Sequence, residues 1–283
     1  MKKLWTVVVV IGLFGFLMGC ATGKSLDSFS GGGGGGSSQM ASGNWDIEAT
    51  SGTAYALGFG GNLTVSGSTV SGNLLPYSGD GCYTPSNTST SVSVNSTISS
   101  GSLPLSIVAG STTFTITLTV PSGTSPATTL TGTYTATGGC EDGLSGNISA
   151  NLVSGTLGGT WSGTDSVTAS VLAFNFSVAS TATTSGNLLG TYAITASSVT
   201  LTPTSSGSCP VTGVSLNADS FAAGKLLFLD VSETEGGIPS EFVVYGTVDS
   251  ATSPSSFNGA YGYLSGGNCL LNVGGNTFTM TKQ

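Results

Sequence analysis

The chain has 283 residues, of which 45 are Gly and only 6% are charged. It contains no His and no Arg, and its 5 Lys face 13 carboxylates, which gives a formal net charge of −8. Without imidazole the chain cannot build Ser-His-Asp or Cys-His catalytic groups, or the commonest transition-metal sites. Nucleic-acid binding is excluded as well, because it needs clustered basic residues to neutralise phosphates.

The N-terminus has the layout of a secretory signal peptide, which we predict over residues 1–19. Lys2 and Lys3 precede a mainly apolar run from Leu4 to Met18. This run is shorter than the roughly 18–20 residues that a helix needs to cross the hydrocarbon core of a bilayer. We therefore expect an export signal that is removed, and not a membrane-spanning helix.

The signal ends in Leu17-Met18-Gly19-Cys20, which resembles the lipobox of bacterial lipoproteins. In that family the Cys sulfur receives a diacylglycerol, the signal is cleaved before the Cys, and the new amino group is usually acylated, with palmitate as a suitable label. The resemblance implies that Cys20 becomes the lipid-anchored first residue, because two or three acyl chains make detachment from a membrane negligible. Ala21 stands where Asp would retain such proteins at the inner membrane, which implies the outer membrane and leaves its periplasmic or surface face open.

Residues 20–40 contain the lipidated Cys and a predicted flexible linker. Six consecutive glycines with flanking serines cannot bury a core, and such a composition behaves as a random coil. We interpret this segment as a tether that holds the folded part of the chain away from the lipid surface.

Four further cysteines indicate a duplicated organisation. Their spacings are 58 and 60 residues within the two pairs, and equivalent members lie 127 and 129 residues apart, at Cys82, Cys140, Cys209 and Cys269. Such regularity is typical of an internal repeat. We predict one β domain over 41–155 and a second over 156–283.

Local sequence supports the repeat. Gly132 and Tyr134 precede Cys140 as Gly259 and Tyr261 precede Cys269. A Gly-x-Trp triplet also begins each predicted domain, as Gly43-Asn44-Trp45 and Gly159-Thr160-Trp161. This triplet resembles the first-strand motif of the lipocalin superfamily, in which an Arg usually accompanies the Trp, and the resemblance implies small β-barrels.

Alternating apolar and polar residues predict an all-β fold. Residues 113–120 place Phe, Ile, Leu and Val on one face and threonines on the other, which is the pattern of a half-buried antiparallel strand. Turn residues interrupt such segments often enough for seven or eight short strands per domain, in a β-barrel or a β-sandwich. A continuous β-solenoid is the alternative fold. The other predicted strands cover 46–50, 54–65, 69–75, 91–98, 129–137, 147–153, 166–178, 191–202, 225–231, 241–248 and 277–281.

In an exported protein the four cysteines are expected to form disulfides. Of the three possible connectivities we predict Cys82–Cys140 and Cys209–Cys269, because each pair then lies within one domain. No cofactor is expected.

Carboxylates are the remaining groups that could support chemistry or bind a cation. Asp230, Glu233 and Glu235 lie close in sequence and run into the turn signal Gly236-Gly237, so we interpret them as a solvated loop. Calcium binding by these three residues is a weaker alternative, because Ca²⁺ prefers oxygen ligands. Glycoside hydrolysis by a carboxylate pair is the catalytic alternative.

Together these features predict a secreted, lipid-anchored protein of the cell envelope. We expect a non-catalytic display or binding module with membrane lipid as one partner and carbohydrate or an envelope protein as the other. Carboxylate-dependent glycoside hydrolysis and a purely structural coat role are the alternatives.

Overall fold

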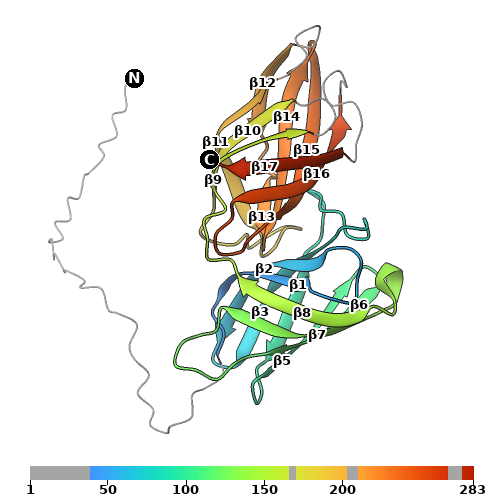
Figure 1. Ribbon diagram of the computed structural model, residues 1–283, viewed down its shortest axis with the longest axis vertical. Helices are drawn as coiled ribbons and strands as arrows, with labels where there is room; N and C mark the ends of the chain where they lie inside the picture. Colours follow the sequence, from blue (N-terminus) through green and yellow to red (C-terminus); the bar gives the residue numbers. More distant parts are fainter. Residues whose placement is uncertain (1–38, 166–169, 203–209, 267–275) are drawn as a thin grey trace, which may run out of the picture. The chain divides into compact units, whose positions relative to one another are not determined.

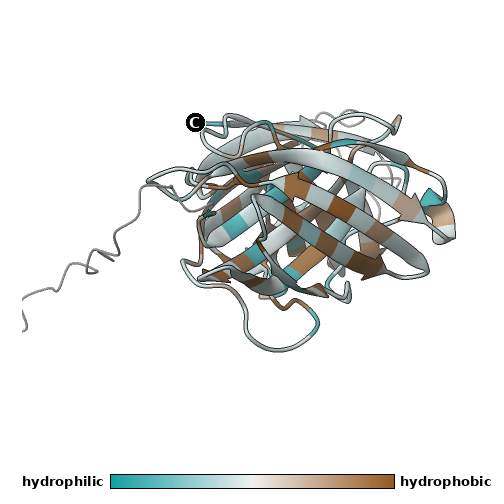
Figure 2. Ribbon diagram, turned by 90° about the horizontal axis from the view of Figure 1, so that it is seen from below, coloured by the Kyte–Doolittle hydropathy of each residue, from teal (hydrophilic) through white to brown (hydrophobic). Residues whose placement is uncertain are grey.

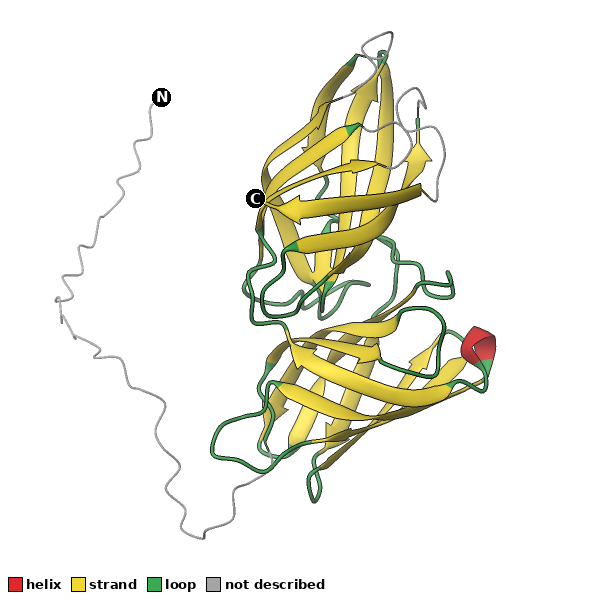
Figure 3. Cartoon of the chain, in the orientation of Figure 1, coloured by secondary structure: helices red, strands yellow, loops and turns green. Residues whose placement is uncertain are grey.

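A computed structural model describes residues 39–165, 170–202, 210–266 and 276–283 of the chain. Residues 36–283 form one compact unit. Strands make up nearly all of its regular structure, together with one short 3-10 turn (Figure 3). Within the described ranges no helix has the length and apolar character needed to span a membrane. The predicted signal and most of the linker lie outside the described residues.

The first sheet, called barrel 1, is an antiparallel meander over residues 43–152 (Figure 1). Its strands follow the order β4-β3-β2-β1-β8-β7-β6-β5. At the two ends of this order, β4 and β5 meet, because Ser99 and Ser102 form a β-bridge and the Ser96 hydroxyl donates to the Pro104 carbonyl. The sheet thus curls into a barrel. Its elements are β1 (Gly43–Ala49), β2 (Leu57–Ser66), β3 (Thr69–Ser78), β4 (Val92–Thr97), β5 (Ser102–Ala109), β6 (Thr112–Thr119), β7 (Thr129–Thr137), the 3-10 turn η1 (Gly139–Glu141) and β8 (Ser145–Leu152).

The second sheet, called barrel 2, spans residues 159–282 and closes through direct pairing of β14 with β15. Its order is β12-β14-β13-β11-β10-β9-β17-β16-β15. The short strands β12 and β13 both pair with β14 and share the place that a single strand takes in barrel 1. The elements are β9 (Gly159–Asp165), β10 (Val171–Val178), β11 (Tyr192–Thr202), β12 (Val211–Leu216), β13 (Phe221–Ala223), β14 (Leu226–Glu235), β15 (Ile238–Val248), β16 (Ser256–Ser265) and β17 (Asn276–Lys282).

The two barrels repeat the same plan, which confirms the prediction of two tandem antiparallel β units. In each, the first strand pairs with the last, as β1 with β8 and β9 with β17. Trp45 and Trp161 occupy equivalent places on the first strands, and their indole Nε1 atoms donate to the carbonyls of Ala41 and Leu157 at 3.0 Å. Because both carbonyls lie four residues before the Trp, the two strands enter their barrels in the same way.

Hydrophobic side chains fill both barrel interiors. Apolar and polar residues alternate along the strands, as the bands of hydropathy show (Figure 2), because successive side chains point to opposite faces of a sheet. On β6 the inward residues are Phe114, Ile116 and Leu118, as the alternation predicts. The largest buried side chains include Trp45 and Tyr134 in barrel 1, with Trp161 and Tyr261 in barrel 2.

Replacing Trp45 by Ala is expected to destabilise barrel 1 by about 3–5 kcal/mol, since it removes a fully buried indole and leaves a cavity. Chemical denaturation followed by tyrosine and tryptophan fluorescence measures this loss. Tyr55, which is 58% exposed, is the matched control, because its replacement by Ala should change the free energy of unfolding by less than about 0.5 kcal/mol. Equal effects of the two changes would contradict the proposed role of Trp45 in the core.

Candidate functional site

The interior of barrel 2 leaves little room for a ligand. Among the described residues, the cavity lined by Leu172, Phe242, Tyr261 and their neighbours inside barrel 2 measures only about 10 Å³. That is about the space of one water molecule. A ligand of sugar size therefore does not fit inside barrel 2.

A polar network connects the outer face of β1 with the hairpin between β13 and β14. The Lys225 ammonium lies 2.7 Å from Glu48 Oε2 and 3.8 Å from Asp46 Oδ2. Asp46 Oδ1 accepts hydrogen bonds from the Tyr77 hydroxyl at 2.8 Å and from the Lys225 backbone N–H at 3.0 Å. The Tyr77 hydroxyl is also within 3.3 Å of Glu48 Oε1. One cation and one phenol thus contact two neighbouring carboxylates, while Asp46 Oδ2 is buried without a hydrogen-bond partner among the described residues.

Asn44 extends this contact along β1. Its side-chain amide donates to the Gly224 carbonyl at 3.2 Å, and its amide oxygen accepts from the Gly224 N–H at 2.8 Å. The approach is close enough to require glycine on both sides. A Cβ on Gly60 would lie 2.0 Å from the Ala223 carbonyl oxygen, and Gly224 has φ +60, a conformation that favours glycine.

Burial changes the acidity of this network. Asp46 is 0% exposed, and desolvation, reinforced by the Glu48 charge, raises the pKa of Asp46 to about 7 although Lys225 acts in the opposite direction. Burial also raises the pKa of Tyr77 well above its ordinary value, with the Asp46 charge adding to the effect. Tyr77 therefore remains a protonated hydrogen-bond donor over the physiological range of pH.

Apolar side chains from both barrels surround the polar network. Leu75 and Tyr77 of β3 pack in one buried cluster with residues of β13, β14 and β15. In this cluster the rings of Phe221 and Phe228 stack with centroids 5.1 Å apart. The two barrels are therefore joined by a core of their own.

Beside this shared core runs a groove of about 310 Å³, which we call the junction groove. Ala56 before β2, the end of β3 and the β3–β4 loop line one side, and residues of β14, β15 and β16 line the other. Tyr77 and Leu226, which belong to the shared core, form part of its floor. Its lining residues are Ala56, Tyr77, Ser78, Gly79, Gly81, Thr84, Pro85, Leu226, Tyr245, Gly246, Thr247, Asn258, Gly259 and Ala260.

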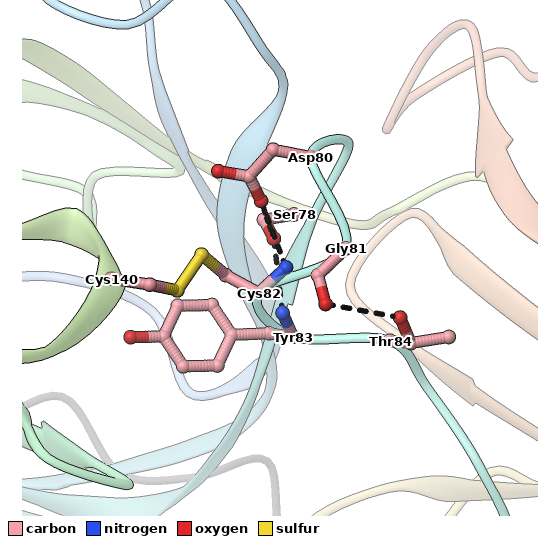
Figure 4. Close-up of a disulfide and its surroundings, with 7 residues drawn as sticks. All are labelled: Ser78, Asp80, Gly81, Cys82, Tyr83, Thr84 and Cys140. Atoms are coloured by element: carbon pink, nitrogen blue, oxygen red, sulfur yellow. Dashed lines mark hydrogen bonds between the residues drawn. A yellow bond between two sulfur atoms is a disulfide. The ribbon is translucent and has the colours of Figure 1, made fainter.

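Cys82 and Cys140 form a disulfide, one of the two pairs predicted from the spacing (Figure 4). It connects the loop between β3 and β4 with η1, and the two Cα atoms lie 6.3 Å apart. Asp80 Oδ1 fixes the loop by accepting from the Cys82 N–H at 2.9 Å and from the Ser78 hydroxyl. Within the described part of the chain, Asp80, Cys82 and Glu141 also group their oxygen and sulfur atoms within 4.8 Å. The disulfide occupies that sulfur, so no thiolate is available to bind a metal.

The remaining predicted cysteine sites, Cys20, Cys209 and Cys269, lie outside the described residues. Lipidation and the second disulfide therefore stay predictions. Along the chain, Cys209 falls between β11 and β12, and Cys269 falls between β16 and β17. These are the counterparts in barrel 2 of the connections that hold Cys82 and Cys140.

The acidic segment from Asp230 to Glu235 is not the solvated loop expected from the sequence. It forms the second half of β14, and all three acidic side chains are buried. Alternation along the strand separates them: Asp230 follows Leu226 and Phe228 on the outer face, whereas Glu233 and Glu235 lie on the inner face. The three residues considered together for calcium are thus divided between the two faces of the sheet.

Asp230 is held by the segment between β12 and β13. Its Oδ1 accepts from the Asn217 side-chain amide at 2.9 Å, and its N–H donates to the Ser220 hydroxyl at 2.9 Å. Burial raises the pKa of Asp230 to about 6, with a contribution from the nearby Glu241. Desolvation together with the adjacent Glu235 raises the pKa of Glu233 to about 8.

Replacing Asp46 by Asn is expected to change how stability depends on pH. A raised pKa means that the folded chain holds a proton on Asp46 after the unfolded chain, with its ordinary value of 3.8, has lost it. The free energy of unfolding should therefore fall as the pH rises from about 4 to about 7. An asparagine amide at this position stays uncharged and removes this contribution to the slope.

Urea denaturation of the wild type and the Asp46→Asn variant between pH 4 and 8 measures how the free energy of unfolding of each depends on pH. Subtracting the slope of the variant from that of the wild type leaves the contribution of Asp46, because Asp230 and Glu233 are present in both proteins. Parallel pH profiles would show that Asp46 does not titrate in this range.

Comparison with known proteins does not assign the chain to a family. No family model, curated protein or solved structure matches it. The resemblance to lipocalins therefore rests on the Gly-x-Trp triplets at β1 and β9. In barrel 2 a cation does accompany the Trp, since Lys282 Nζ lies 5.7 Å from the ring centroid of Trp161, where the sequence offers no Arg.

Proposed function

We propose that this chain is a lipid-anchored, non-catalytic binding module of the cell envelope, and that it binds carbohydrate in the junction groove. The observation that carries this proposal is the groove of about 310 Å³ between the two barrels, beside a barrel 2 whose interior is filled. Pockets of this size, with an apolar surface and a few polar groups, suit small ligands.

The chemistry of the lining favours a neutral saccharide. Tyr245 contributes a partly buried ring, which suits the flat apolar face of a sugar, while Thr247 and Asn258 contribute a hydroxyl and an amide for its hydroxyl groups. All described lining residues are uncharged. Anionic ligands would also be repelled by the net charge of −8.

Rigid walls support a binding role. Tyr77, which lines the groove, is held through its hydroxyl by Asp46 and Glu48, and Gly224, two residues before the lining residue Leu226, is held by Asn44 from the opposite barrel. A groove that is already ordered loses less conformational entropy when a ligand binds. The junction therefore serves as a preformed surface.

The same lining argues against hydrolysis. A glycosidase of the usual kind places two carboxyl groups on either side of the scissile bond. The described residues that line the groove include no carboxylate, and Asp46 and Glu48 are engaged behind it by Tyr77 and Lys225. For this reason we favour binding over carboxylate-dependent catalysis.

The lipid anchor is proposed on the lipobox resemblance at Cys20. Labelled palmitate is expected to enter the wild-type chain and not the Cys20→Ala variant, because the variant lacks the acceptor sulfur. Autoradiography of the purified chains measures the label. Equal labelling of the two would contradict the lipoprotein assignment and leave the binding proposal standing.

Binding in the junction groove is tested with the fragment 36–283 on an array of neutral glycans. Asn258→Ala and Tyr245→Ala are each expected to weaken binding about tenfold, which corresponds to about 1.4 kcal/mol. Asn258 is exposed, so its replacement should leave stability unchanged even if Tyr245→Ala disturbs the shared core.

Ile238→Ala is the control, because Ile238 is 55% exposed and does not line the groove. Binding that is unchanged in both groove variants would place the ligand elsewhere. A fragment that binds no glycan at all would contradict the proposal and favour the structural coat role.

A further inference from the structure

Barrel 1 closes along only part of the seam between β4 and β5. Among the described residues, backbone pairing across this seam is limited to Ser99 and Ser102, which exchange two hydrogen bonds of 2.9 Å. Two residues further along β5, the Pro104 carbonyl accepts from the Ser96 hydroxyl. Beyond that point β5 pairs with β6 alone. The second half of β5 is therefore an open strand edge.

Two residues of this edge present their backbone groups to the seam. Along an antiparallel strand, successive residues direct their N–H and C=O groups to alternate sides. Ser102 bonds toward β4, so Ser106 and Val108 face the same way, and no strand of the described ranges pairs with them there. The Val108 side chain, which is 55% exposed, lies on the outer face of the same edge. An unpaired edge of this kind is a template for the addition of another strand.

A groove of about 580 Å³, which we call the seam groove, lies beside this edge. The end of β5 lines one side, the segment 89–93 lines the other, and Leu75 and Tyr83 contribute apolar surface. None of the described residues that line it is charged. It shares only Thr84 with the junction groove, so the two grooves are separate places on the molecule.

Barrel 2 shows what covers the equivalent edge. Counted back from the last strand of each barrel, β14 is the counterpart of β5, and both strands continue through a two-residue turn into the next strand. Aligning the two turns places Ser106 at Ser232. In barrel 2 this position is not open, because Ser232 pairs with Ser215 of β12 in antiparallel register. A separate short strand thus occupies the place that is left free in barrel 1.

The strand β12 also indicates the chemistry of a suitable occupant. It has 6 residues and no charge. Its apolar side chains Val211, Val214 and Leu216 pack against the core of barrel 2, while its backbone pairs with β14. An occupant of the seam groove would likewise pair with Ser106 and Val108 and direct apolar side chains toward the groove.

The occupant has to be a single extended segment. The segment 89–93 lies across the groove from β5, so the edge of a second folded sheet has no access to the seam. An extended peptide, in contrast, brings one strand only. The uncharged lining favours an uncharged peptide, because a buried charge without a partner is costly.

We propose that the seam groove binds an extended, uncharged peptide segment of a partner protein, which adds to barrel 1 as a strand antiparallel to β5. In this mode of recognition, main-chain hydrogen bonds give affinity, and pockets for alternate side chains give specificity. Ser106 and Val108 supply the main-chain groups, and Leu75 and Tyr83 supply the apolar contact. The site adds a peptide ligand to the carbohydrate proposed for the junction groove.

The test is titration of the full chain with a fluorescent peptide, followed by fluorescence anisotropy. The probe Val-Thr-Gly-Val-Ser-Leu copies β12, and we expect saturable binding. Hydrogen exchange measured by NMR should show the amides of Ser106 and Val108 exchanging rapidly in the free chain and slowly with the peptide bound. If both amides are already protected in the free chain, the edge is not open and the proposal is overturned.

Two changes at one residue separate the backbone from the side chain. Ser106→Pro removes the N–H that faces the seam, and Pro104 shows that this edge accommodates proline. It should weaken peptide binding at least about fivefold, the effect of one lost hydrogen bond. Ser106→Ala keeps the N–H and should bind the peptide as the wild type does. The Tm of each variant shows whether it is folded.

Val108→Ser is a second variant that leaves the backbone unchanged. It should weaken binding about twofold by removing an apolar cross-strand contact. The proposal is overturned if the wild type shows no saturable binding up to about 1 mM peptide. It is also overturned if Ser106→Pro and Val108→Ser both bind as tightly as the wild type, which would place the peptide on another strand, or if Ser106→Ala loses as much as Ser106→Pro. Neither Ser106 nor Val108 lines the junction groove, so these results do not depend on carbohydrate binding.

Discussion

A sheet whose outer strands are unpaired presents free N–H and C=O groups, and proteins often shield such edges with lysines or other charged residues. In this chain only 6% of the residues are charged, so that protection is scarce. Both sheets avoid the problem by curling until β4 meets β5 and β14 pairs with β15. Closure in turn requires a filled interior, which Trp45, Trp161 and the inward faces of the strands provide. Because the interiors are full, the outer surfaces and the junction are left to bind a ligand.

Alternation in the sequence predicts most of the strands and fails where glycine or proline interrupts it. The predicted strand 113–120 agrees with β6 to within one residue at each end. The strand β5 is not predicted, because Pro104 lacks an N–H and argues against a strand. In the structure Pro104 lies on β5, and the neighbouring strand β4 contacts it through the Ser96 hydroxyl, which donates to the Pro104 carbonyl. The N–H that proline lacks is therefore not needed for this contact. The strand β9 is missed because it is rich in glycine, yet a Cβ on Gly163 would lie 1.9 Å from the Thr279 carbonyl oxygen of its partner strand.

The candidate sites are less accessible to sequence reasoning. Asp46 and Lys225 are far apart in the chain, and no local pattern indicates that β1 and the β13–β14 hairpin meet. A faint signal exists in the alternation of Asn44, Asp46 and Glu48, which places three polar groups on one outer face of a strand. At Asp230–Glu235 the turn signal of the following glycine pair leads the sequence analysis to predict a loop, although these residues belong to β14. The alternation of inward and outward side chains along the strand continues through these acids, so Glu233 and Glu235 lie on the inner face.

Pairing of the first strand with the last also sets an order of assembly. Barrel 1 can close once β8 has been made, whereas β9 must wait for β17, and contacts so distant in sequence form slowly because a long loop has to close first. Asp46 on the outer face of β1 is covered partly by Tyr77 of its own barrel and partly by Lys225 of the β13–β14 hairpin. Full burial of Asp46 therefore requires both barrels and is a property of the joined unit.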